Sequence, residues 1–298
     1  MELRVLQYFL AITREQSISG AAEALHLSQP TLSRQIKEME EELGKQLFIR
    51  GNRRIILTEE GMILRKRAEE IMELVKKAED EISWPEEIVA GNITVGAGET
   101  NGVHFLTKAA RAVQNDHPLV HFHIISGDKA TVSDSMDKGL IDFGLFFGKI
   151  DASKYEYIRL PYTDTWGVLM RRDSPLAQKE SISAEDLPDK PLIVSRQALQ
   201  EADLQDFFRL EYDKLNIVGT YNLLFNGSLM VEDGMGYALC LDHIINVSGN
   251  GNLCFRPFSP KWEAEMFLAW KKYQILPKAA ERFLQKLREI IGANSAQL

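Results

Sequence analysis

The sequence of 298 residues predicts a multidomain α+β protein, in which a small helical domain, one long helix and a larger α/β domain follow one another. Two short helical patterns and two apolar runs around a turn fill residues 17–57. An unbroken apolar seam follows in residues 58–83, and strand and helix patterns alternate from Gly91 onward. We therefore place the domain boundaries at 1–57, 58–87 and 88–298.

The small domain predicts two helices joined by a short connection. Ser19 is the expected N-cap of the first helix, which continues through an alanine-rich run. Ser28 is the expected N-cap of the second, Pro30 lies in its first turn, where a missing N–H costs nothing, and Gly44 ends it. The apolar residues of the second helix recur at helical spacing and predict its buried face: Leu32, Ile36, Met39 and Leu43.

The other face of the second helix suits the base edges and phosphates of a DNA major groove, because it carries short hydrogen-bonding groups and two cations. Its members are Ser28, Gln29, Pro30, Thr31, Ser33, Arg34 and Lys37. Many helical proteins have a capped helix with a solvated polar face, and that is the alternative interpretation. The preceding alanine-rich helix, the short connection and the early proline together favour a helix-turn-helix that binds DNA.

A basic hairpin is predicted directly after this helix. Gly51 and Asn52 supply a turn between the apolar residues 47–49 and 55–57. The cations of this segment follow one another with no acid between them: Lys45, Arg50, Arg53 and Arg54. We interpret the hairpin as a wing that contacts the DNA backbone.

The charge of the whole chain does not by itself indicate DNA binding. The formal net charge is −8 and the sequence pI is near 5.4. The first 60 residues carry eight Lys and Arg against nine Glu. Attraction to DNA must therefore come from a local patch such as the wing, while the acidic remainder repels DNA from other faces.

The compartment expected for this chain is the cytoplasm. Its two cysteines do not predict a disulfide framework, and no apolar stretch reaches the length that spans a membrane. The first residues lack the basic segment, apolar core and cleavage site of an export signal.

Residues 58–83 predict one long helix with Thr58 as its N-cap. Its apolar positions are spaced by four and three residues, like a short heptad seam: Leu64, Ala68, Ile71, Val75, Ala78 and Ile82. We expect this seam to form a dimer, because about 25 helical residues span nearly 40 Å, more than a small domain can cover. The alternative is an amphipathic helix that lies on its own domain.

Two similar α/β lobes are predicted after the long helix, the first at about 88–161 with 267–298 and the second at about 162–266. The strands expected in the first lobe are residues 93–95, 120–124 and 143–147, with a helix at 103–115. In the second lobe we expect strands at 166–170, 192–194, 217–221 and 237–241, and helices near 199–212 and from Ser228. A strand at 265–270 and a helix at 277–291 close the chain.

Two other motifs give weak indications of a nucleotide site and a metal site. Gly96, Gly98 and Gly102 follow a strand like a dinucleotide fingerprint, but the third glycine is one place late and no acid ends the next strand. His121 and His123 share one face of a strand, and no third metal ligand stands near them. We therefore expect neither a nucleotide nor a metal site, and no cofactor.

Cys240 and Cys254 lie in apolar runs and are expected in the core. Nothing in the sequence predicts a lowered thiol pKa at either position. The chain also lacks a nucleophile with its base, a phosphate loop or a metal cluster, so it is not expected to be an enzyme.

The first 61 residues resemble the LysR-type transcriptional regulators. The resemblance is carried by residues 17–22, 25–30, 32–36, 41–43 and 57–61, with Gly44, Leu47, Phe48 and Arg50, and weaker echoes continue along the chain. It implies a winged helix-turn-helix, a linker helix that forms a dimer, and an effector domain of two lobes like a periplasmic solute-binding protein. It also implies tetramers built from two dimers. Met39 and Thr31 depart mildly from the family pattern, and neither threatens the assignment.

The resemblance places an effector between the two lobes, and it implies that a hydroxyl just after the first strand, here Thr100, contacts the ligand. The other residues expected to bind the effector follow the ends of predicted strands or lie in a later loop: Asn101, Ser126, Gly127, Asp128, Phe147, Gly148, Ser195, Arg196 and Asn226. Such residues are also ordinary turn formers, which is the alternative. Arg196, if it faces the cleft, favours a carboxylate or phosphate on a polar or anionic effector.

The function implied is transcriptional regulation, in which the effector closes the lobes, changes how dimers pair on promoter DNA, and so alters access by RNA polymerase. The alternative is a cytosolic ligand-binding or redox-sensing protein of the same architecture without a ligand-driven role at a promoter. The sequence does not fix the effector, the target genes or the sign of regulation.

Overall fold

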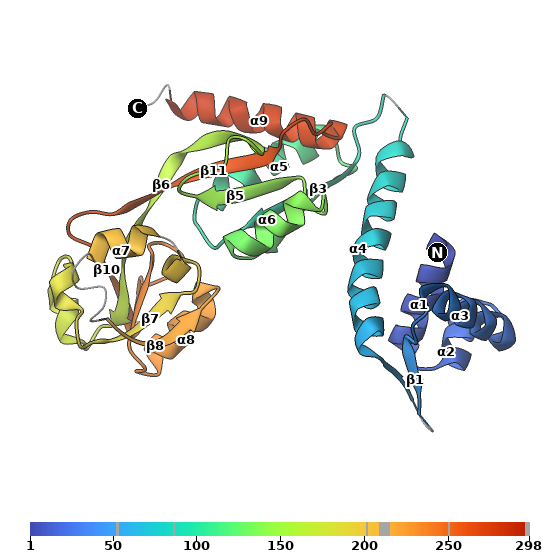
Figure 1. The fold of residues 1–298 in the computed structure, drawn as a ribbon. Coiled ribbons are helices and arrows are strands. Elements are labelled where there is room, and N and C mark those ends of the chain that lie inside the picture. Colours follow the sequence, from blue (N-terminus) through green and yellow to red (C-terminus); the bar gives the residue numbers. More distant parts are fainter. Residues whose placement is uncertain (52–53, 86, 201, 209–214, 250, 296–298) are drawn as a thin grey trace. The chain divides into compact units, whose positions relative to one another are not determined.

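The computed structural model describes residues 1–51, 54–85, 87–200, 202–208, 215–249 and 251–295. They form two compact units, Met1–Trp84 and Pro85–Leu298, each with a core of its own. Figure 1 shows a helical first unit and a second unit of mixed helix and sheet. The α+β organisation predicted from the sequence is confirmed.

The first unit contains a helix that the sequence analysis did not identify, α1 (Leu3–Glu15), whose buried side chains include Phe9 and Ile12. The next helix begins two residues earlier than expected, because Ser17 rather than Ser19 is its N-cap and accepts the Gly20 amide at 3.2 Å. Ser17 has the extended backbone that an N-cap needs, whereas Ser19 is already helical. The remaining elements are α2 (Ile18–Ala24), α3 (Gln29–Leu43), β1 (Phe48–Arg50), β2 (Ile55–Leu57) and α4 (Glu59–Ile82).

α4 is joined tightly to the hairpin of β1 and β2. The Thr58 hydroxyl accepts the Gly61 amide at 3.0 Å and donates to the Gln46 carbonyl at 2.8 Å. A Cβ added at Gly61 would lie 2.2 Å from the Leu47 carbonyl oxygen, so only glycine allows this close approach. The start of the long helix is therefore fixed to the wing.

The apolar seam of α4 is divided between two environments. Ala68 is fully buried in the core of the first unit, and Leu64 and Ile71 pack against that core. Val75 is half-buried, Ala78 is exposed, and Ile82 is 82% exposed. The first half of the seam is thus covered by its own domain, as the alternative interpretation expected, and dimerisation stays a prediction for the rest.

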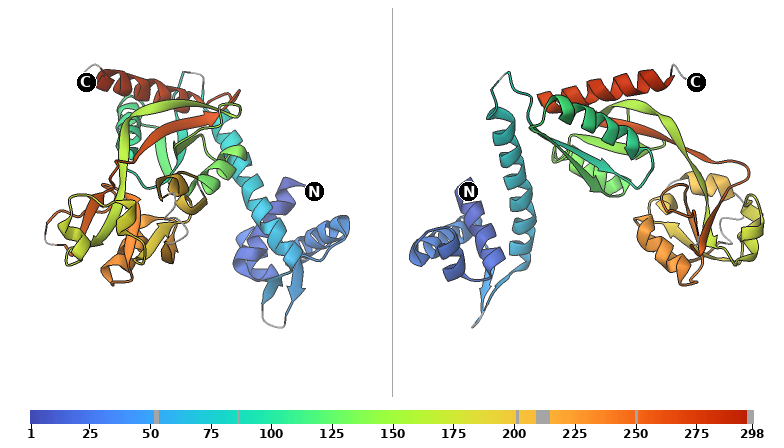
Figure 2. Two further views of the ribbon diagram at one scale, coloured as in Figure 1. Left: turned by 60° about the vertical axis from the view of Figure 1, so that its left-hand side comes forward. Right: turned by 180° about the vertical axis from the view of Figure 1, so that it is seen from behind.

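Lobe I of the second unit is a sheet in the order β4-β3-β5-β11-β6, with β4, β3 and β5 parallel. Helices α5 and α9 lie side by side on one face of this sheet and α6 on the other (Figures 1 and 2). The elements are β3 (Gly91–Ala97), α5 (Val103–Asp116), β4 (Val120–Ser126), α6 (Lys129–Asp137), β5 (Phe143–Phe147), β6 (Tyr155–Arg171), β11 (Glu263–Lys271) and α9 (Lys278–Ser295).

Lobe II continues the same sheet in the order β6-β9-β7-β8, with β10 also paired to β6. α8 packs on one face, while α7 and the short 3₁₀ turns cover the other. The elements are η1 (Pro175–Gln178), η2 (Ala184–Asp186), β7 (Pro191–Ser195), η3 (Ala198–Gln200), α7 (Ala202–Phe208), β8 (Asn216–Tyr221), α8 (Leu224–Glu232), β9 (Tyr237–Leu241) and β10 (Leu253–Pro257).

The two lobes share β6, a strand of 17 residues. It pairs with β11 as far as Thr165, and from Trp166 onward with β9. The predicted lobe boundaries at 162 and 266 therefore fall within strands β6 and β11. α8 begins at Leu224, four residues before the predicted start, and residues 201 and 209–212 of the helix expected at 199–212 lie outside the described residues. No described helix is long and apolar enough to cross a lipid bilayer.

Candidate DNA interface and effector cavity

The first turn of α3 is exposed and built around its cap. Ser28 Oγ accepts the Thr31 amide at 3.3 Å and lies 2.7 Å from Thr31 Oγ1. Gln29 and Pro30 are exposed beside them, and Gly44 ends the helix with a φ of 65°. Because Leu32 and Ile36 hold the opposite face in the core, this turn is presented to solvent.

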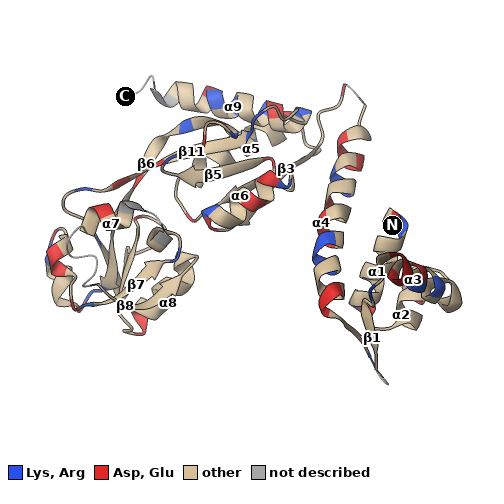
Figure 3. Cartoon of the chain, in the orientation of Figure 1, with Lys and Arg blue, Asp and Glu red and all other residues tan. Residues whose placement is uncertain are grey.

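Two cations extend the exposed face of α3. Arg34 Nε lies 3.7 Å from Glu38 and Lys37 Nζ lies 3.3 Å from Glu41, with both cations about 70% exposed. Figure 3 shows the basic and the acidic residues of this helix in separate stretches. Exposed pairs of this kind contribute little stability, so a DNA phosphate can replace the carboxylates. Ser33 is half-buried and presents less surface.

The wing is anchored by a carboxylate of α3. Glu40 Oε1 accepts the amides of Leu47 at 2.7 Å and of Phe48 at 3.2 Å, which fixes the start of β1. Arg54 is exposed and directly precedes β2. Its carbonyl accepts the Gly51 amide at 3.3 Å.

The structure describes only part of the predicted wing, and one of its cations is in an exposed ion pair. Lys45 Nζ lies 3.1 Å from Glu60 Oε1. The basic run contains no acid in the sequence, but in the folded chain Glu60 lies next to it. Arg50 belongs to β1, and of its side chain nothing is described. Asn52 and Arg53, both part of the predicted wing, lie outside the described residues.

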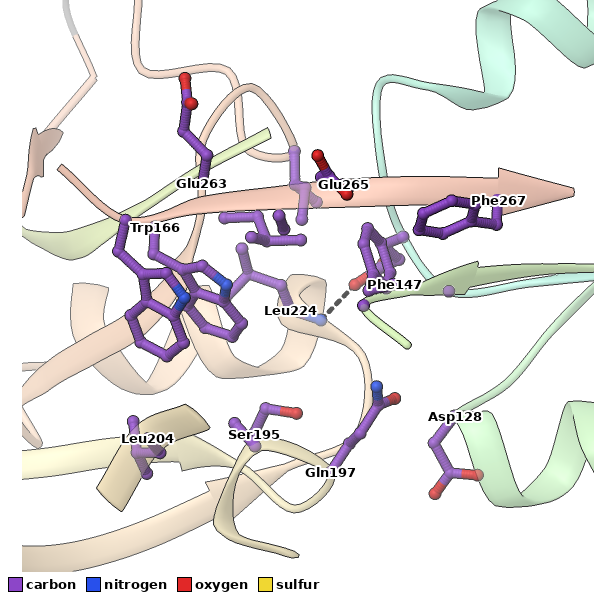
Figure 4. A pocket seen from close by; sticks show the side chains of 18 of the residues that line it. Asp128, Phe147, Trp166, Ser195, Gln197, Leu204, Leu224, Glu263, Glu265 and Phe267 are labelled. Atoms are coloured by element: carbon purple, nitrogen blue, oxygen red, sulfur yellow. Dashed lines mark hydrogen bonds between the residues drawn. The ribbon is translucent and has the colours of Figure 1, made fainter. Parts of the chain in front are cut away.

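A cavity of about 570 Å³ lies between the two lobes of the second unit. Five of the ten residues predicted to bind an effector line it: Gly127, Asp128, Phe147, Gly148 and Ser195. Figure 4 shows Ser195 and Gln197 on the lobe II side and Asp128 on the lobe I side. The strand ends that the sequence pointed to therefore do meet at one place.

The other five predicted residues do not line this cavity. Thr100 Oγ1 donates to Asp164 at 2.5 Å and accepts the Gly102 amide at 2.9 Å, and Asn101 borders a second cavity. Asn226 is exposed within α8 and not in a loop, because this helix begins two residues before it.

Ser126 and Arg196 are the last two of the five predicted effector residues that do not line the cavity. Arg196 is exposed and is not among the lining residues, although its charge adds to the hydrogen bonds from Thr131 that lower the pKa of Asp128, which lines the cavity. Ser126 is the last residue of β4 and is also exposed.

Two polar residues that the sequence analysis did not single out connect the lobes across the cavity. Glu99, from lobe I, accepts the amide of Leu224 at the start of α8, and the dashed line in Figure 4 marks this bond. Gln197 Oε1, from lobe II, accepts the amide of Lys129 at the start of α6 at 3.1 Å. Each stands two residues after the end of a strand, which is the signal that could have found them.

Aromatic side chains supply much of the remaining wall. Trp166 and Trp262 stack with ring centroids 4.7 Å apart, and Tyr157 and Phe267 meet edge to face at 5.5 Å. Such walls favour a flat apolar group on the ligand. No sequence pattern pointed to them, because their positions belong to β6, β11 and the loop before β11.

A buried acid, Asp164, lies in β6, the strand that the two lobes share. Asp164 is fully buried, and its Oδ1 has no hydrogen-bond partner among the described residues. Burial raises the pKa of this carboxyl above its ordinary value, against hydrogen bonds from Thr100 and Tyr162 that lower it. At the cavity, by contrast, Thr131 donates to Asp128 and lowers the pKa of that carboxyl.

The two cysteines are buried, as predicted. They lie on β9 and β10, which flank β6 on opposite sides, so their spacing exceeds the roughly 7 Å limit for a disulfide between Cα atoms. Burial also raises the pKa of the Cys240 thiol, which makes it less reactive.

His121 and His123 are the two histidines considered as a metal pair. His123 Nε2 lies 3.1 Å from Asn92 Oδ1. Among the described residues, no group of three or more His, Cys, Asp and Glu is arranged to hold a metal ion.

Comparison with known families finds two matches that together span most of the chain. The model described as the LysR substrate binding domain matches residues 87–291. The model described as the bacterial regulatory helix-turn-helix protein, lysR family, matches residues 3–62.

Full-length relatives and structures agree with these matches. The HTH-type transcriptional regulator BsdA of Bacillus subtilis (strain 168) is 29% identical over 295 residues, which cover 95% of this chain and 99% of the relative. The Hca operon transcriptional activator HcaR of Escherichia coli (strain K12) is 27% identical and covers 99% and 100%. Full-length CbnR in complex with its target DNA has the same fold, with a TM-score of 0.75, 18% identity, and coverage of 97% and 99%.

Proposed function

Because this chain belongs to the LysR family of transcriptional regulators, with a DNA-binding helix-turn-helix and an effector-binding domain, we propose that it binds two promoter half-sites as a dimer or tetramer and responds to a small molecule held between its lobes. The observation that supports this most directly is the exposed, capped first turn of α3 on a domain whose other face is buried core.

Within the interface, Gln29 and Arg34 read base edges, because both are exposed and both can make two hydrogen bonds to one base. Each good contact of this kind contributes roughly 1–3 kcal/mol of discrimination. Arg54 and the other wing arginines contact phosphates and supply affinity that depends on salt.

The dimer forms through the parts of α4 that its own domain leaves open. Ile63 and Leu74 are 61% and 38% exposed and lie on one side of the helix, and Ile82 is exposed near its end. With Met62, four large apolar side chains of this helix are exposed, and such surface favours a helix partner. The part of the predicted seam beyond Ile71 therefore remains the proposed dimer contact, and Ile63 and Leu74 add apolar surface to it.

The effector occupies the cavity between the lobes and biases how far they close. This motion changes how two dimers pair, which alters the bend or spacing of the bound DNA and so the access of RNA polymerase. The activity needs promoter DNA and no catalysis, and we place it in the cytoplasm and regard the chain as a regulator rather than an enzyme.

The test is footprinting of the full-length protein on the DNA that flanks its own gene, at low and moderate salt. We expect protected half-sites spaced by whole helical turns. Arg34→Ala should lose preference for this site over random DNA by about tenfold or more, and Arg54→Ala should reduce the salt slope by about one for both DNAs.

Arg111→Ala is the matched control, because this exposed arginine lies in α5 of the effector-binding unit. It should change neither quantity. Absence of any protected half-site at low salt would overturn the proposal.

A further inference from the structure

The two lobes cap each other's helices in a reciprocal way. Glu99 stands two residues after β3 and accepts the first amide of α8, and Gln197 stands two residues after β7 and accepts the first amide of α6. β3 and β7 each begin a β-α-β-α-β run, and α6 and α8 are the second helices of these runs. The same position in each lobe therefore performs the same task, once with a carboxylate and once with a neutral amide.

The two caps are not equivalent in charge. α6 also has a cap of its own, since Asp128 accepts the Thr131 amide at 2.9 Å. α8 follows Leu223, which offers no side-chain cap, so the carboxylate of Glu99 is what lies at its positive end. The carboxylate of Glu99 therefore already occupies the N-terminus of α8, where a ligand carboxylate would otherwise bind.

Four of the five charged residues that line the cavity are acidic. Glu99, Asp128, Glu263 and Glu265 line it, and the one lysine or arginine among the lining residues is the exposed Lys149. Glu265 and Glu263 have cations of their own, Arg159 at 2.6 Å and Lys261 at 2.5 Å.

Glu99 differs from these glutamates. Within the described part of the chain it has no Lys, Arg or His at ion-pair distance, and the Leu224 amide uses only one of its acceptor positions. It is half-buried at the end of β3. The remaining acceptor capacity is free for a donor that brings positive charge.

We propose that Glu99 sets the charge class of the effector: the cavity takes a small molecule with an ammonium group and a flat apolar body, and it rejects carboxylates. The inference rests on the proposed function of this cavity as the effector site. The ammonium donates to Glu99, and the apolar body lies against the aromatic wall that includes Trp166 and Phe267. A carboxylate must either displace Glu99 from α8 or lie next to it at the cost of like-charge repulsion.

The experiment is isothermal calorimetry on the full-length protein with two probes of similar shape, 2-phenylethylammonium and 3-phenylpropionate. For the wild type we expect the ammonium to bind at least tenfold more tightly than the carboxylate. Glu99→Gln keeps the cap, as Gln197 does at the equivalent position, and should reduce this ratio of affinities tenfold or more. Glu99→Ala frees the α8 amides and should reverse the preference.

Glu156→Gln is the matched control, because this exposed carboxylate of β6 does not line the cavity. It should leave the ratio unchanged, and circular dichroism of each variant checks its fold. A ratio that is the same in the wild type, Glu99→Gln and Glu99→Ala overturns the inference, as does a wild type that prefers the carboxylate. Footprinting without a ligand is independent of this outcome, so failure here with half-sites protected refutes the charge class alone.

Discussion

Removal of the Glu40 carboxylate should loosen the wing from the recognition helix. Glu40 is half-buried on α3, and its Oε1 accepts two backbone amides at the start of β1, those of Leu47 and Phe48. Both of these residues are buried, so in Glu40→Ala their amides lose a charged acceptor with little water to replace it.

The magnitude follows from the number of bonds and their exposure. A hydrogen bond to a charged group contributes about 1.5–3 kcal/mol, and the half exposure of Glu40 argues for about 2 kcal/mol for the pair. In a unit the size of Met1–Trp84, each 1 kcal/mol shifts the melting temperature by about 4–8 °C. We therefore expect a fall of about 8–15 °C in the calorimetric transition of the first unit, with that of the second unchanged.

Two further variants make this prediction refutable. Glu40→Gln retains an oxygen acceptor and should lose less than half as much. Glu42→Ala removes a neighbouring glutamate of α3 that pairs with the Met1 amino group at the surface, and should change the transition little. Equal losses in Glu40→Ala and Glu42→Ala would show that the two amide contacts do not hold the wing.

Two more predictions concern close packing and a buried charge. Gly61→Ala should unfold or strongly destabilise the first unit, because its Cβ would meet the Leu47 carbonyl at 2.2 Å, whereas Gly20→Ala, whose nearest contact is 3.5 Å, should be neutral or stabilising by thermal melting. Burial raises the pKa of Asp164 above its ordinary value, so its contribution to stability is complete below that ordinary value and is lost as the pH rises through the folded pKa. Asp164→Asn should flatten the decline of the second unit's melting temperature from pH 4 to 8, and parallel curves for the two proteins would contradict this.

The features that the sequence predicted well are those fixed by near neighbours. Ser28 and Thr58 cap helices through amides three residues away, and Gly44 ends α3 by its own backbone conformation. Such contacts leave their signature in a short window, so the recognition helix, wing and linker could be predicted to within a residue or two. The sequence predicts Ser19 as the N-cap of α2, whereas the structure has Ser17, because both serines precede the same alanine run.

The features that the sequence could not supply depend on residues far apart in the chain. The Glu99 to Leu224 bond spans 125 positions, and the Gln197 to Lys129 bond spans 68. Thr100 was expected to face a ligand, but the hydroxyl is bound to Asp164, 64 positions away. Strand ends indicate where a cavity forms, whereas the side chain that enters it is decided by packing between lobes.

The route of the chain through the second unit fixes when each part can be completed during synthesis. Lobe I needs β11 and α9, since Phe283 and Leu287 of α9 are fully buried in its core, while the strands of lobe II are all made by Pro257. The unit Met1–Trp84 precedes both and has its own core. A growing chain thus completes its helix-turn-helix unit first and the cavity between the lobes last, so a product truncated before α9 would keep the DNA-binding unit but lack a complete lobe I.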